Sequence, residues 1–365
     1  MTAKRIIGQI HLWLGLASGL VVFILGLTGA IYAFSDEIKS FVYQDRLYVD
    51  APTGKQKLSL DILLPIAEKA IGKEHKISRA QLPQDPSGAY MFRALKVDKE
   101  AFGYWNYYQY FYKVYLNPYT GEVIHLENAK YEFFTLVLAL HMNLLLGDAV
   151  GHVIVRWSVV CFVVLLLSGL VLWWPKKWKR KQLKNNFRIK WNAKFKRLNY
   201  DLHNVLGFYA LLLLLIIALT GLAWSFELTT DKKSKVLSDT TQSLGKLPAD
   251  LILKQAQASA PASAYFLYNF PAAKSGTVNV SAYQSSIQFY DRLQYRFDRY
   301  NGKLLQKGIG FTELGAGAKL IALNYDLHTG SVLGLFGKLL AFLAGLIAAS
   351  LPFTGLVIWL KRKRK

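Results

Sequence analysis

Four of the seven histidines in this 365-residue sequence occupy equivalent positions in its two halves. His11 and His203 are each followed by a glycine after four residues and by a Thr-Gly pair after seventeen. His141 and His328 each follow a leucine and precede a glycine by six residues. Imidazole side chains that recur at such matched spacings are candidates for a shared chemical task.

Two imidazoles that face each other can supply both axial ligands of a b-type haem iron. Ionisable side chains near membrane segments are functional candidates, and these four histidines flank apolar stretches. Gly15 and Gly207 lie one helical turn from His11 and His203, so a flat macrocycle could approach the backbone there. The alternative is that each histidine is a polar anchor at the membrane surface, copied by duplication, and the residues alone leave both interpretations open.

Two further residues are candidates near His141. In one continuous helix His152 would share the face of His141, because eleven residues correspond to nearly whole turns. His152 could be an alternative ligand, and Arg156 could bind a haem propionate. Both could equally be contacts at the outer leaflet. His75 and His125 are expected at the surface.

Four apolar stretches must position these side chains. Each is close to the roughly 20 residues that a helix needs to cross the hydrocarbon core, and together they predict four membrane helices. The first is too long for a removable signal peptide. The stretches are Leu12–Phe34, Val153–Trp174, Val205–Phe226 and Leu339–Leu360.

The basic residues predict the orientation of these helices. Of a formal net charge of +22, eleven positive charges and no acid lie in the connector Pro175–Asn199. Lys361–Lys365 adds five more, and Lys4 and Arg5 two. Because positively charged flanks stay in the cytoplasm, both termini and the connector are expected there. The charge is thus an orientation signal and a contact for anionic membrane lipid, and no nucleic-acid partner is expected.

Further segments repeat between the halves. Ser168–Trp173 matches Thr354–Trp359, and Tyr112–Ile124 resembles Tyr295–Leu305, each read as strand, tight turn and strand. The chain is therefore predicted to be two tandem helix–domain–helix repeats, with a short helix in each outer domain, over Leu60–Ile71 and over Pro248–Ala258. The expected organisation is membrane helix 1 in 1–34, an outer α+β domain in 35–140, helix 2 in 141–174, a basic cytoplasmic loop in 175–199, helix 3 in 200–226, a second outer domain in 227–327, helix 4 in 328–360 and a basic tail in 361–365.

Several cofactor motifs are absent from the sequence. The single cysteine, Cys161, cannot form an internal disulfide, and without a Cys-x-x-Cys-His motif covalent c-type haem is excluded. There is no Gly-x-Gly-x-x-Gly motif or P-loop, so no recognisable site for a nicotinamide, flavin or ATP is present.

The repeated Leu-His and Thr-Gly-Leu-x-x-Trp motifs resemble the PepSY-associated transmembrane family, and Leu116–Val123 looks like the PepSY domain signature. The resemblance covers almost the whole chain. It implies a bacterial inner-membrane protein with two periplasmic PepSY-like domains and two haem b groups, similar to ferrioxamine-type reductases. Such an oxidoreductase reduces ferric siderophores at its periplasmic side. The iron ligands implied are His11, His203, His141 and His328.

The expected helix directions set the pairing of these ligands. His11 and His203 would lie near the cytoplasm, and His141 and His328 near the periplasm. The two faces are separated by about 30 Å of helix rise, which excludes pairs between them. Some relatives carry a fused flavin-reductase module that this sequence lacks, so the electron donor stays open.

Reduction would release iron because Fe²⁺ binds oxygen-rich chelators much less strongly than Fe³⁺. The aromatic run Tyr104–Tyr112 could shape the approach of a siderophore, or could be a strand core or membrane-surface belt. Two other functions stay open. One is a non-enzymatic membrane module that binds a periplasmic partner, and the other is a transporter, suggested by the repeat symmetry.

The charge distribution gives the first testable prediction. Single cysteines introduced near Ser87 and after Lys365, in a chain with Cys161→Ser, should be labelled from opposite sides of the membrane. An impermeant maleimide should reach only the cysteine near Ser87 in intact cells, and should reach both after the cells are opened. Labelling of both positions in intact cells would contradict the topology.

Overall fold

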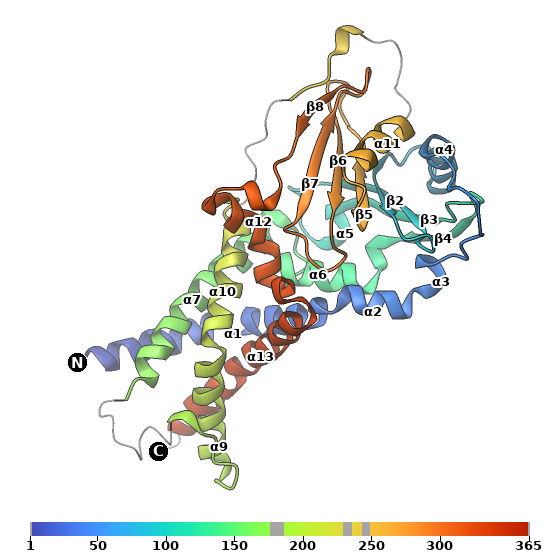
Figure 1. Ribbon diagram of the computed structural model, residues 1–365. Helices are drawn as coiled ribbons and strands as arrows, with labels where there is room; N and C mark the ends of the chain where they lie inside the picture. The colour runs from blue at the N-terminus through green and yellow to red at the C-terminus, as the bar shows by residue number, and fades with distance from the viewer. Residues whose placement is uncertain (1, 176–185, 229–235, 243–248, 364–365) are drawn as a thin grey trace.

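The computed structural model describes residues 2–175, 186–228, 236–242 and 249–363, which form a bundle of long helices with a β-sheet at one end (Figure 1). Some predicted features lie outside these ranges. They are six basic residues of the connector, the last two residues of the tail, and Pro248, where a helix over 248–258 was expected to begin.

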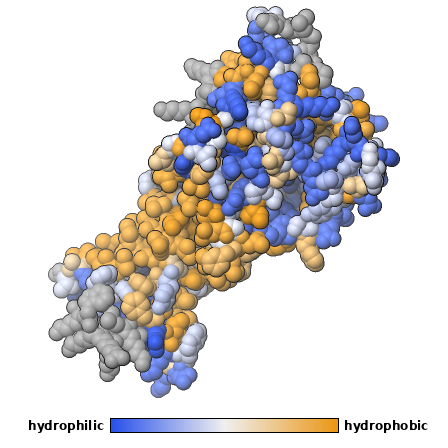
Figure 2. Space-filling view, viewed as in Figure 1, coloured by the Kyte–Doolittle hydropathy of each residue, from blue (hydrophilic) through white to orange (hydrophobic). Residues whose placement is uncertain are grey.

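Four helices have the length and composition to cross a membrane, as predicted. The candidate spans are Ala3–Ala33, Asp148–Trp173, Phe195–Ser225 and Ser331–Lys361. Figure 2 shows their hydrophobic surface, in contrast to the mixed surface over the sheet. The long helices are α1 (Ala3–Ala33), α7 (Val153–Trp173), α10 (Gly207–Ser225) and α13 (Gly334–Lys363). Short helical segments precede three of them. They are η2 (Asp148–His152) before α7, α9 (Phe195–Asp201) and η3 (Leu202–Leu206) before α10, and η6 (Ser331–Leu333) before α13.

Helices α1 and α13 cross at small residues. A Cβ atom added to Gly26 would lie 2.7 Å from both the Ala349 nitrogen and the Gly345 oxygen. Side chains of this size let the two backbones touch, which is how helices pack where lipid offers no hydrophobic driving force. This crossing joins the first and last membrane helices of the chain.

The sheet is antiparallel and has the strand order β4-β3-β2-β1-β5-β6-β7-β8. Each half of the chain supplies four consecutive strands, and the halves join where β1 pairs with β5. The two outer segments 35–140 and 227–327 are therefore not separate in space, as the sequence suggested, but share one sheet. Pairing β1 with β5 removes two exposed edges that separate domains would have to protect. The strands are β1 (Ile77–Pro83), β2 (Tyr90–Val97), β3 (Tyr108–Leu116), β4 (Val123–Asn128), β5 (Tyr265–Asn269), β6 (Val278–Tyr283), β7 (Arg292–Phe297) and β8 (Leu304–Lys307).

Helices α4 (Leu60–Ile71) and α11 (Ala249–Ser259) cover one face of the sheet and enclose a single apolar core with it. The sequence predicted both helices. Their N-termini cap each other, because the Asp61 carboxylate accepts hydrogen bonds from the Ala249 and Asp250 amides and the Asp250 carboxylate accepts one from the Leu60 amide. A carboxylate at a helix N-terminus satisfies free amides and favours the helix dipole, so these bonds tie the two halves together.

The two predicted hairpins are present. Gly121 closes the turn between β3 and β4 with φ of +76°, and Gly302 closes the turn between β7 and β8 with φ of +67°. The aromatic run over 104–112 forms α5 (Tyr104–Tyr107) and the first half of β3. The remaining elements are α2 (Ser35–Val42), α3 (Gln44–Leu47), η1 (Ala129–Tyr131), α6 (Phe133–Asn143), η4 (Thr240–Gln242), η5 (Phe311–Glu313) and α12 (Ala316–Thr329).

His141 and His328 do not begin membrane helices 2 and 4, as the boundaries 141–174 and 328–360 assumed. They lie in the separate helices α6 and α12, between the long helices and the sheet (Figure 1). Leu144 and Leu145 have φ of +55° and +61° and end α6, because positive φ cannot continue a right-handed helix. The helix is thus broken between His141 and His152, and the argument that they share one helix face does not hold.

The crossing of α1 and α13 predicts that Gly26→Ala lowers stability by about 1–3 kcal/mol, since the added methyl group forces two backbones apart. Thermal unfolding in detergent should show a lower Tm for this variant. Gly317→Ala in α12 is the matched control, because nothing lies within 4 Å of an added Cβ there. Equal Tm values for the two variants would contradict the packing.

Candidate functional site

The structure brings the four repeat-related histidines together in two pairs. The ring centroids of His11 and His203 are 6.4 Å apart, and those of His141 and His328 are 6.2 Å apart. The ring planes are nearly perpendicular in both pairs, at 83° and 73°. Each pair joins one histidine from each half of the chain, as the sequence predicted.

Each imidazole is held by a hydroxyl group of a neighbouring long helix. Nδ1 of His11 and of His203 lies 2.8 Å from the side-chain oxygen of Ser168 and Thr354, respectively. In the other pair Nδ1 lies 3.0 Å from the hydroxyl of Thr28 (for His141) and of Thr220 (for His328). The same arrangement therefore occurs four times.

The hydroxyl groups determine which ring nitrogen carries the proton. Each donates its single hydrogen to a carbonyl of its own helix, as in the 2.7 Å bond from Thr220 to Ile216 and the 2.6 Å bond from Thr28 to Ile24. The hydroxyl oxygen can then only accept, so Nδ1 must donate. For His328, the carbonyl of Ile217, three residues before Thr220, also lies 3.0 Å from Nδ1 and can accept a hydrogen bond from the ring. Nε2 is consequently the unprotonated nitrogen, and its lone pair is available to a metal.

A glycine follows each of these hydroxyl residues and makes room for the ring. A Cβ atom added to Gly29 would lie 3.1 Å from Cε1 of His141, and the other three glycines would give 3.3–3.4 Å. We call each Ser/Thr-Gly pair a histidine seat; the four seats are Ser168-Gly169, Thr354-Gly355, Thr28-Gly29 and Thr220-Gly221. The sequence showed these dipeptides but not what they contact.

Gly15 and Gly207, where the sequence suggested that a macrocycle could approach the backbone, contact leucines of neighbouring helices. An added Cβ would lie 3.8 Å from Leu165 at Gly15 and 3.6 Å from Leu351 at Gly207, and no imidazole is within 4 Å of either. Both glycines pack against a neighbouring helix. The glycines that bring backbone close to the imidazoles are those of the seats, on the adjacent helices.

The free nitrogens in each pair suit one shared metal ion. Within the described residues, no group forms a hydrogen bond with Nε2 of any of the four histidines. A metal–imidazole bond is about 2 Å long and the ring nitrogen is about 1 Å from the ring centre, so opposed axial rings have centres about 6 Å apart. Both pairs have this spacing. No cluster of three or more His, Cys, Asp or Glu side chains able to hold a metal occurs in the described ranges, so the other ligands would have to come with the metal.

Two asparagines that sequence reasoning missed support the seats. Asn324 donates to the Thr220 carbonyl at 3.2 Å, and Asn199 donates to the Thr354 carbonyl at 2.9 Å. Both are buried and lie four residues before a histidine. Since the equivalent positions of the first half hold Ile7 and Val137, repeat matching could not reveal them.

His152 ends η2 and belongs to neither pair. Arg156, one turn further along, places its guanidinium 5.1 Å from the ring centre of Phe226. Its Nε is buried and has no hydrogen-bond partner in the described part of the chain. An unsatisfied buried donor of this kind is suited to an anion such as a carboxylate.

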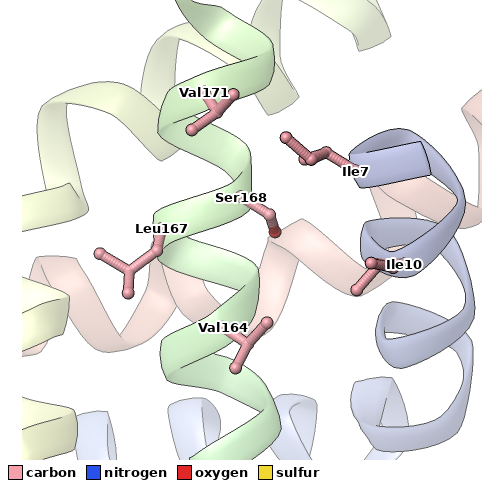
Figure 3. A pocket seen from close by; sticks show the side chains of 6 residues that line it. All are labelled: Ile7, Ile10, Val164, Leu167, Ser168 and Val171. Atoms are coloured by element: carbon pink, nitrogen blue, oxygen red, sulfur yellow. The ribbon is translucent and has the colours of Figure 1, made fainter. Parts of the chain in front are cut away.

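A groove of about 250 Å³ between α1 and α7 leads to the seat of His11 (Figure 3). Ile7 and Ile10 face Val164 and Val171 across it, and Ser168 is its polar side chain. Because Ser168 binds His11, this groove gives the pair of His11 and His203 an approach from the side of the helices rather than along their axes.

The model of one known protein family, described as the PepSY-associated TM region, matches residues 9–362. The match includes all four histidines and all four seats. No curated protein matches the chain.

Proposed function

The chain belongs to the PepSY-associated transmembrane family, and on this premise we propose that it carries electrons across the bacterial inner membrane through two b-type haems. The electrons reduce ferric siderophores on the periplasmic side, which makes the protein a ferric-siderophore reductase. The observation that carries the proposal is the repeated pairing of imidazoles about 6 Å apart, each with Nδ1 bound and Nε2 free.

The residues fit haem b better than a simple metal ion. A haem macrocycle supplies four nitrogen ligands, so the protein need add only two axial imidazoles. His11 and His203 would hold one haem and His141 and His328 the other, with Arg156 available to a propionate. Each haem supplies reversible one-electron chemistry between Fe³⁺ and Fe²⁺.

The protein's own residues orient the imidazoles and tune them. The hydrogen bond from Nδ1 to the seat fixes the plane of each ring and makes Nε2 a stronger donor, which favours the higher charge on iron. In a bilayer, the apolar side chains of α1, α7, α10 and α13 would keep water away from the pairs. Both effects set the potential at which the protein accepts and gives up an electron.

The positions of the pairs suit transfer across a bilayer. Helix α1 carries His11 and also the seat of His141 at Thr28, seventeen residues later. At 1.5 Å per residue, the two positions are about 25 Å apart along the helix, which is close to the hydrocarbon thickness. In the orientation predicted from the basic flanks, a haem held by His11 and His203 would lie at the cytoplasmic side, where electrons would enter. A haem held by His141 and His328 would lie beside the sheet, at the periplasmic side.

The two other functions considered from the sequence have no need of paired imidazoles. A partner-binding module or a transporter would purify without a haem spectrum. The absorption spectrum of the purified protein therefore separates electron transfer from both.

Replacement of the histidines tests the ligand assignment. His11→Ala and His203→Ala should each remove the inner haem, and His141→Ala and His328→Ala the outer one, because each replacement removes one of the two protein ligands proposed for that haem. Haem content per chain should fall from two to one in each variant. His75→Ala is the control and should retain both. Two haems in His11→Ala and His328→Ala would show that the ligands are others, with His152 the first candidate.

Replacement of the seat hydroxyls tests the tuning. Thr220→Val removes an acceptor from Nδ1 of His328 and should raise the potential of the outer haem by about 40 mV, the one-electron equivalent of about 1 kcal/mol. Thr354→Val is the matched variant and should raise the inner potential alone. The two potentials are read from a spectroscopic redox titration. If Thr220→Val shifted neither potential, or both equally, the seat would not act through its own histidine.

A further inference from the structure

A row of polar side chains crosses the sheet on the face that α4 and α11 leave uncovered. Consecutive members are direct partners in the strand register, so their side chains share one face. Their neighbours Ala80 and Phe92 point to the opposite face and lie in the apolar core. The central members of this polar row are Lys113, Arg93, Arg79, Asn269, Asn279 and Arg296.

The two arginines at its centre stand directly opposite each other without an acid between them. Arg79 and Arg93 are register partners on β1 and β2, and neither forms an ion pair within the described residues. Lys113, in contrast, pairs with Glu127 at 3.4 Å. Like charges directly opposite on neighbouring strands destabilise a sheet. Their retention in the sheet interior points to an anion that both arginines bind.

Hydrogen-bonding capacity is also left over at this position. Arg79 donates Nε to Asn269 at 2.7 Å, but Nε of Arg93 is buried and has no partner in the described ranges. Burial and the adjacent Arg79 lower the pKa of Arg93 to about 10, so Arg93 is still charged near neutral pH. A charged, buried donor without an acceptor is costly unless a ligand completes it.

This face of the sheet is turned toward the membrane helices. Tyr265 lies on β5 on the same face as Asn269. Its pKa is raised, mainly by burial and less by Tyr283 and by Asp36, and Asp36 lies at the start of α2, which follows membrane helix α1. A continuous series of ring contacts with centroid distances of 4.7–6.0 Å connects the face to the outer histidine pair. The series runs from His328 through Trp224, Tyr325, Phe289 and Tyr283 to Tyr265.

A propionate of the outer haem is the alternative anion for Arg79 and Arg93. Arg156, in the span that follows α6, is the better-placed partner for a propionate of the outer haem. The anion for Arg79 and Arg93 should therefore come from outside the protein.

We propose that Arg79 and Arg93 bind carboxylate groups of the electron acceptor, so that this chain reduces carboxylate-bearing, negatively charged ferric chelates. The proposal rests on the reductase function proposed above and narrows its substrate class. A guanidinium group binds a carboxylate through two parallel hydrogen bonds, and two adjacent guanidinium groups select an acceptor with more than one carboxylate. One electron from the outer haem, which is thereby oxidised, reduces the bound Fe³⁺ to Fe²⁺, and the arginines exchange no proton.

Binding is measured first, with a probe that cannot be reduced. Gallium(III) citrate should bind the full-length protein in nanodiscs, and Arg93→Gln and Arg79→Gln should each weaken binding about tenfold or more, since each removes charge-assisted hydrogen bonds. Lys96→Gln, an exposed cation on the same strand, is the matched control and should leave the dissociation constant unchanged. Arg93→Lys should retain part of the affinity, and higher salt should weaken binding to the unaltered protein.

Electron transfer is measured second, as the rate at which acceptors reoxidise the reduced protein. With ferric citrate the rate should fall about tenfold in Arg93→Gln, whereas with a cationic ferric trihydroxamate it should not change. Gallium citrate binding that is insensitive to both glutamine variants and to salt would overturn the proposal. A second result would also overturn the proposal. If Arg93→Gln lost a haem or shifted the potential of the outer haem while citrate binding was unchanged, a haem propionate would be the anion that Arg93 binds. Absence of haem from the unaltered protein would instead refute the reductase function, while the gallium measurement would still decide the anion site.

Discussion

The hydrogen bond between each seat hydroxyl and Nδ1 of a histidine is the interaction on which the rest of the site depends. The hydroxyl has already donated its only hydrogen to its own helix, so the imidazole must donate from Nδ1 and present an unprotonated Nε2. Without this constraint an apolar bundle would give no preference between the two tautomers. The seat glycine is equally necessary, because a Cβ at Gly29 would lie 3.1 Å from the ring of His141. Hydroxyl and glycine together fix both the chemistry and the position of the ring.

The remainder of the fold keeps the two imidazoles of each pair opposite each other. Every pair takes one imidazole from each half of the chain, so any rotation between halves would separate the rings. The β1–β5 pairing and the reciprocal caps of Asp61 and Asp250 connect the halves in the sheet and its covering helices. The close crossing of α1 and α13 at Gly26 connects them within the bundle. The symmetrical strand order is consistent with two repeats whose histidines meet across a common axis.

Local and periodic features were predictable from the sequence, and contacts between distant segments were not. Apolar length gave the four spans, and repeat spacing gave the pairs of His11 with His203 and His141 with His328. The shared sheet was missed because nothing in Ile77–Pro83 or Tyr265–Asn269 indicates that the two strands pair with each other. The break after α6 was missed because Leu144 and Leu145 adopt positive φ although leucine does not favour it. The opposed arginines became visible only through the strand register.

The central claim is that each chain holds two haem b groups between paired imidazoles. The most direct measurement is low-temperature electron paramagnetic resonance of the oxidised protein, with haem b quantified per chain as the pyridine complex. The account predicts two haems per chain, both low-spin because each iron would have two imidazole ligands. A preparation from haem-replete cells that contains no haem, or whose irons are high-spin with an open axial position, would contradict it.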